Sequence, residues 1–315
     1  MKVGYPIALT LCFALCWMGQ GITNGQDSVL TQDAKFTLKV DVASFARTKL
    51  GGRLIKLTEQ LASEELEDVQ GNVLQKVQEA LGFDPLKEIR TIAVVGASYE
   101  DPQEHVKLVM QMGTTTGNLE GLALALPGYE AEDYGSQTIH AVGDGDQHAF
   151  ATILTAPDGK KTILATTEKG DLKAAIDAES ATYATALKSA DAFMEIEVLE
   201  LPAEALEQEQ VANISKMLQG VSASLAEKGS DLSIELNLTA SNDKRAEQIQ
   251  QLAQGLKALG GLFEQEIQDD DDLQFLSGLI DRVQVNREQN RVVIQLAVPE
   301  QLVVDFLREE ADLPL

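Results

Sequence analysis

The residues between 230 and 263 predict a strand that turns directly into a long helix. Apolar residues first alternate with polar ones, which is the period of a strand with one buried face: Leu232, Ile234, Leu236 and Leu238. Ser241 and Asn242 then offer oxygen acceptors to the first N–H groups of a helix. The apolar residues that follow recur at helical spacing: Ile249, Leu252, Ala253, Leu256, Leu259 and Phe263. A chain built on such a unit needs a sheet that a helix can cover.

A weaker copy of this unit lies about 125 residues earlier, at residues 105–126. The order of predicted strands and helices around the two copies is similar, which indicates an internal duplication. We expect a first repeat at residues 35–178, a join at 179–189, a second repeat at 190–309 and a tail at 310–315. Identical residues between the repeats are few, so chance similarity of element order is the alternative.

The fold class that we expect is α+β, with two related halves, each a mainly antiparallel sheet covered on one face by helices. Short turns between consecutive strands favour the antiparallel arrangement. Within this plan we expect a loop after Pro127-Gly128, an extra strand at residues 162–166 and a helix containing Val211, Ile214 and Leu218. The polar side chains of the strands should share a face that meets water or a partner: Thr37, Lys39, Asp41, Glu195, Glu197, Ser233, Glu235 and Asn237.

The first 25 residues resemble a secretory signal peptide. They carry one charge, Lys2, then an apolar run from Tyr5 to Met18 and a glycine-rich exit. A membrane anchor would need about 20 apolar residues, and a lipoprotein would need small residues where Leu11 and Leu15 precede the cysteines. We therefore expect an exported protein, periplasmic or extracellular, without an integral membrane span once the leader is cleaved. Both cysteines leave with it.

The chain is strongly acidic, with 50 acidic and 25 basic residues and a net charge of −25. Nucleic-acid binding depends on neutralising phosphates, so this balance argues against it, and it equally disfavours anionic lipid surfaces. The partners that it favours are a protein or a cation. High charge also serves solubility, and that reading stays open.

Two acidic clusters invite a metal. The first surrounds the turn Gly143-Asp144-Gly145-Asp146, where Asp144, Asp146 and His148 are candidate ligands. A turn centred on Asp144-Gly145 would direct His140 and His148 to opposite faces of a hairpin, which disfavours a zinc site. The second cluster is a run of candidate calcium ligands, Asp269, Asp270 and Asp271. It lacks the spacing of an EF-hand and also fits a helix start.

Catalytic motifs are missing from the sequence. It contains no G-x-S-x-G elbow, H-E-x-x-H pair or phosphate-binding glycine loop, so no catalytic residue and no cofactor is predicted. A hydrolase that uses scattered Asp and Glu residues remains the alternative, although few aromatic residues are present to hold a sugar.

The segment Leu81-Gly82-Phe83-Asp84-Pro85-Leu86-Lys87-Glu88-Ile89 ends a predicted helix before a strand. It resembles a family of uncharacterised exported proteins from Planctomycetes-type bacteria, which share the duplicated strand–helix plan. This resemblance implies no activity, cofactor or site residue. The function that we expect is therefore a non-catalytic, exported binding or scaffolding protein of the bacterial envelope.

Overall fold

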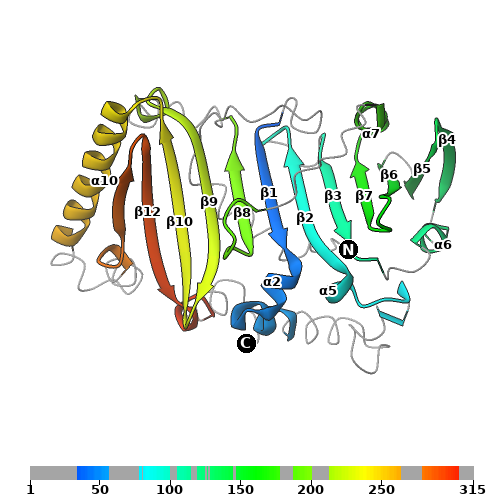
Figure 1. Cartoon of the computed structure of the whole chain (residues 1–315), viewed down its shortest axis with the longest axis horizontal. Coiled ribbons are helices and arrows are strands. Elements are labelled where there is room, and N and C mark those ends of the chain that lie inside the picture. Colours follow the sequence, from blue (N-terminus) through cyan, green and yellow to red (C-terminus); the bar gives the residue numbers. More distant parts are fainter. Residues whose placement is uncertain are drawn as a thin grey trace.

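The fold is dominated by one antiparallel sheet. A computed structural model describes residues 34–56, 78–79, 81–99, 105–114, 119–124, 126, 128–144, 147–177, 187–200, 213–263 and 279–304. Their twelve strands lie side by side in the order β11-β12-β10-β9-β8-β1-β2-β3-β7-β6-β5-β4 (Figure 1). The strands are β1 (Phe36–Asp41), β2 (Ile89–Gly96), β3 (Lys107–Met112), β4 (Glu130–Tyr134), β5 (Gln137–Asp144), β6 (Gln147–Thr155), β7 (Lys161–Thr166), β8 (Met194–Val198), β9 (Leu218–Lys228), β10 (Asp231–Ala240), β11 (Gln284–Glu288) and β12 (Arg291–Pro299).

The strands of the two predicted halves meet where β1 pairs with β8, and they continue as one sheet. β3 is the second strand beyond β1 on one side of this pair, and β10 is the second strand beyond β8 on the other. A helix follows each of them in the chain. The two strand–helix copies thus occupy matching places, as expected, while a common origin of the halves stays a prediction.

Three details of the sequence interpretation are wrong. Residues 130–134, expected in a loop, form the edge strand β4. Leu218 begins β9 instead of continuing a helix. The strand at 161–166 is not the extra one, because β7 lies beside β3 as β12 lies beside β10, and β4 and β5 are the strands with no counterpart. An acidic edge strand such as β4 lacks the apolar alternation on which the prediction depended.

The helices begin where the sequence provides caps. Asp41 accepts a hydrogen bond from the backbone N–H of Ser44 at 2.7 Å, and Asn242 accepts one from the N–H of Arg245 at 3.0 Å. Gly82 has a φ of +72°, which suits the glycine expected after a helix. The helices are α2 (Val42–Arg47), α5 (Pro85–Glu88), α6 (Leu119–Ala123), α7 (Lys169–Asp177) and α10 (Asp243–Phe263).

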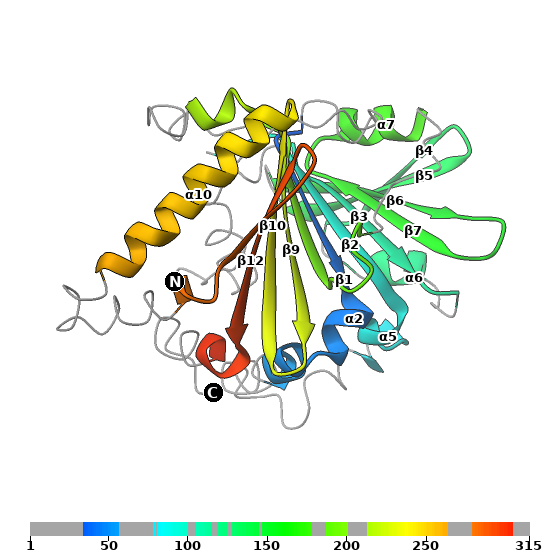
Figure 2. The ribbon, with the colours of Figure 1, turned by 60° about the vertical axis from the view of Figure 1, so that its left-hand side comes forward.

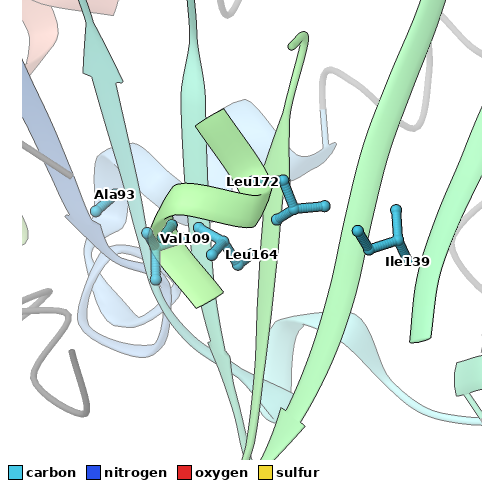
Figure 3. Packing of buried hydrophobic residues seen from close by; sticks show 6 residues of the cluster. Ala93, Val109, Ile139, Leu164 and Leu172 are labelled. Atoms are coloured by element: carbon cyan, nitrogen blue, oxygen red, sulfur yellow. The ribbon is translucent and has the colours of Figure 1, made fainter. Parts of the chain in front are cut away.

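Opposite faces of the sheet carry α7 and α10, and we call them the α7 face and the α10 face. Leu172 and Ala175 of α7 are buried against Val109 and Leu164 of β3 and β7 (Figure 3). Ala246 and Ile249 of α10 pack instead against a cluster around Val292. On the α10 face, Leu50 of the first half also packs against Leu225 and Leu232 of the second.

The strand register shows an apolar row that runs along the α10 face from one end of the sheet to the other. One row of directly paired residues crosses all twelve strands, and His140 is its single polar member. Of its members His140 and Ile196 are buried, and the others are half-buried or, at Ala131, exposed. The row is Ala131, His140, Ala151, Ala165, Leu108, Val94, Leu38, Ile196, Ala223, Leu236, Ile294 and Val285.

Candidate functional site

The α7 face changes character at β1. The row of Leu164, Val109 and Ala93 on this face is apolar. From β1 onward most of the paired residues are polar. Paired residues of an antiparallel sheet point to the same side, so these polar side chains form one continuous surface. We call it the polar band: Thr37, Lys39, Glu195, Glu197, Ser222, Ser224, Glu235, Asn237 and Gln295. The polar residues that the sequence analysis assigned to a common face thus share one.

Both carboxylate oxygens of Glu235, in the polar band, accept hydrogen bonds. Gln295 Nε2 donates a hydrogen bond to Glu235 Oε2 at 2.9 Å, and Asn237 Nδ2 donates to Glu235 Oε1 at 3.0 Å. These hydrogen bonds, above all the one from Gln295, lower the pKa of the Glu235 carboxyl against the opposing effect of burial. The half-buried side chain therefore stays an anion well into acidic pH, with both oxygens held in place.

Two further carboxylates, Glu195 and Glu197, are more deeply buried in the polar band. Glu195 is 3% exposed and Glu197 9% exposed. The backbone N–H of Lys188 donates to Glu195 Oε2 at 2.6 Å, and its Nζ donates to Glu197 Oε1 at 2.8 Å. Thr37, paired with Glu197 across β1 and β8, is 5% exposed, and its hydroxyl has no hydrogen-bond partner among the described residues. A basic side chain thus already occupies this part of the band.

The sequence analysis missed Lys188 and Gln295. Gln295 alternates with Ile294 and Leu296, so its place on the polar side of β12 was readable from the strand period. Lys188 precedes β8 in a segment without regular structure, and no pattern in the sequence links it to Glu195 and Glu197.

The predicted metal ligands are not brought together. Asp144 lies in β5 opposite Gln147, and His140 pairs with Ala151 instead of the expected residue 149. His148 is exposed on β6 and stacks on Phe150 with ring centroids 6.3 Å apart. His140 is buried on the other face, where its Nδ1 lies 2.9 Å from the hydroxyl of Tyr129. The two imidazoles therefore point to opposite faces, as expected.

The other metal candidates, Asp146, Asp269, Asp270 and Asp271, lie outside the described residues. Within the part of the chain that the structure describes, no three His, Cys, Asp or Glu side chains gather as a metal site would require. In that same part, no helix combines the length and the apolar character needed to cross a bilayer.

Comparisons with known proteins give a likeness of structure alone. No protein-family model and no curated protein sequence matches the chain. Three crystal forms of TP0453 are similar to it, each at 10% sequence identity: form III covers 90% of this chain and 99% of its own with a TM-score of 0.44, form IV covers 89% and 95% at 0.43, and form I covers 91% and 98% at 0.39. All three TM-scores fall below 0.5, and they carry no inference about this chain.

Proposed function

We propose that the protein is a non-catalytic, exported binding or scaffolding protein of the bacterial envelope, which holds a protein partner through its sheet. The observation that carries this proposal is the polar band. It spans β1, β8, β9, β10 and β12 on one face, and the side chains at its β10–β12 end keep part of their surface in solvent. Export rests on the pattern of the first 25 residues.

Preorganisation supports binding at this end of the band. Gln295 and Asn237 hold the Glu235 carboxylate in one geometry before any partner arrives. A group fixed in this way loses little conformational entropy on binding, so more of the contact energy appears as affinity. The acidic excess of the chain favours a partner with a basic surface, which electrostatic attraction would also bring to the sheet faster.

The experiment is capture of partners from the envelope fraction of the native host by the immobilised mature protein. Glu235→Lys should remove the captured protein, because it reverses the charge in the centre of the exposed part of the band. Glu247→Lys is the matched control, since Glu247 is exposed on α10 and the charge change is identical. Equal capture by both variants would contradict binding through the band.

A hydrolase is the second candidate function, and the two buried carboxylates Glu195 and Glu197 favour it. Both carboxylates accept hydrogen bonds from Lys188, which gives them a structural role. A binding protein would have the same use for such a role. A hydrolase screen separates the two functions. Turnover that a single change such as Glu197→Gln abolishes would refute the binding proposal.

A further inference from the structure

The structure leaves two strands at the ends of the sheet, and they differ in how well they are protected. Among the described strands, β4 pairs only with β5, and β11 pairs only with β12. An edge strand exposes unpaired N–H and C=O groups, and proteins commonly guard such edges with charge or with a covering helix.

The β4 edge is guarded by charge, and α7 is attached to one face of the strand. Three of its side chains are acidic: Glu130, Glu132 and Asp133. Lys169 and Lys173 of α7 both bind the Glu132 carboxylate, and Tyr134 donates a hydrogen bond to Asp177 at 2.7 Å. These contacts fasten α7 to the edge strand, so a further strand would meet both fixed side chains and excess negative charge.

Within the described residues the β11 edge is less guarded, because α10 contacts β11 but leaves a groove beside it. Its sequence, QVNRE, carries one positive and one negative charge, and every residue except Val285 is exposed. Glu288 and Arg291 pair with each other, and the two residues between them, 289 and 290, form the turn. Gln289 has a φ of +55°. The residues that flank such a turn exchange backbone hydrogen bonds, and the alternation along the ladder then directs the N–H and C=O groups of Val285 and Arg287 away from β12.

A groove runs beside this free edge. It has a volume of about 450 Å³ and lies between α10 and the chain that enters β11. Ala258, Val283 and Val285 give it an apolar wall. Lys257 reaches across it, and its Nζ donates to the carbonyl oxygen of Val283. α10 begins close to the strands and its far end stands away from them (Figure 2). Accordingly, Ile249 is buried and Leu256 is 67% exposed.

We propose that β11 and the adjoining groove bind an extended segment of a partner protein, which pairs with β11 as a thirteenth strand. Main-chain groups at Val285 and Arg287 would supply the pairing. The apolar side chains of the segment would face α10 and Val285, and its polar ones would continue the polar band past Gln284 and Asn286. This inference rests on the proposed function and names the partner's chemistry.

The strong negative charge of this chain favours a partner protein over a second copy as the occupant of the edge. Each copy carries a net charge of −25, so pairing two copies edge to edge would bring like charges together. A neutral or basic segment avoids this repulsion. The segment should alternate apolar and polar residues, because β11 and β12 place apolar pairs on one face of the sheet and polar pairs on the other.

The test uses the full-length mature protein and a labelled peptide of alternating valine and threonine with lysine at each end. Fluorescence anisotropy should show saturable binding to the wild type. Arg287→Pro removes an outward N–H and should weaken binding at least tenfold, whereas Arg287→Ala keeps that N–H and should retain binding. Ala131→Pro places the same proline on the β4 edge and should also bind normally.

Ala258→Trp provides an independent variant, because it fills the groove without touching the backbone of β11. It should weaken peptide binding at least tenfold. Thermal unfolding, followed by circular dichroism, checks that each variant is folded. The inference would be overturned if the wild type did not bind the peptide, or if Arg287→Pro and Ala258→Trp bound it as tightly as the wild type does. So would dimers of the wild type that Arg287→Pro dissociates, since the edge would then hold a second copy.

The outcome also separates this inference from the proposed function. If Arg287→Pro still captures the envelope partner that Glu235→Lys loses, the edge inference fails and the proposed function stands. If the wild type captures no envelope partner, the proposed function fails even when the peptide binds.

Discussion

Glu235 and Gln295 face each other across β10 and β12, and the Gln295 amide donates to the Glu235 carboxylate at 2.9 Å. This hydrogen bond makes the largest contribution to lowering the pKa of Glu235. A carboxyl whose pKa is lower in the folded state stabilises the fold above its unfolded pKa. That stability disappears as the pH falls through the folded value.

Gln295→Ala should therefore raise the pKa of Glu235 and move acid unfolding to higher pH. The loss of stability near neutral pH should be about 1 kcal/mol, which is typical of one hydrogen bond to a charged group in a partly exposed site. A carboxyl titration by NMR measures the pKa directly. Gln284→Ala is the control, because Gln284 is the next residue in the same row and is exposed. An unchanged Glu235 pKa in Gln295→Ala would refute the assigned cause.

The attachment of β4 to α7 should persist below the pH at which an ordinary glutamate is protonated. Hydrogen bonds from Lys169 and then Lys173 lower the pKa of Glu132 to about 2, from an ordinary value of 4.5. The contribution of Glu132 to stability is thus complete above pH 4.5 and is lost as the pH falls toward 2.

Hydrogen exchange at β4 measures this attachment. Glu132→Gln should speed exchange there at neutral pH, whereas Glu130→Gln on the same strand should not. In the wild type, protection of β4 should persist at pH 3. Protection that disappears together with the first protonation near pH 4.5 would contradict the lowered pKa.

Gly96 has no room for a side chain. A Cβ at this position would lie 2.2 Å from the Phe36 ring, which is paired with Gly96 and stacks on Tyr99 at a centroid distance of 5.4 Å. Gly96→Ala should force the ring to move and cost about 1–3 kcal/mol in the free energy of unfolding. Denaturant unfolding measures the change.

Gly255 provides the matched comparison for Gly96. It lies inside α10, and nothing stands within 4 Å of an added Cβ. Gly255→Ala should raise the free energy of unfolding by up to about 1 kcal/mol, because alanine favours the helix. If both alanine variants changed stability alike, steric contact with Phe36 would not be the reason that residue 96 is glycine.

Much of this fold was predictable because alternation is strong on the inner strands. The apolar residues from Leu232 to Leu238 lie on one side of β10, and their polar neighbours lie on the other, so both faces are readable from the sequence. The strand β4 was not predictable, because an acidic edge strand resembles a loop. The pairing of β1 with β8 was not predictable either, since alternation identifies a strand and its faces but not its neighbour.

The candidate site divides in the same way. The place of Glu235 on the polar side of its strand follows from the sequence period. Its partner Gln295 lies 60 residues further along the chain, and only the register of β10 with β12 brings the two together. The contact of Lys188 with Glu197 depends on a segment without periodic structure, which leaves no trace in the sequence pattern.

The central claim is that the exposed end of the polar band contacts a partner protein. Photo-cross-linking in the native host tests it most directly, with a photoreactive amino acid placed at Ser233, which lies on this face of β10. The same amino acid at Asp158, in an exposed turn between β6 and β7, is the control. We predict a discrete adduct, heavier than the chain, from position 233 and none from position 158. No adduct from position 233, or the same adducts from both positions, would contradict the account.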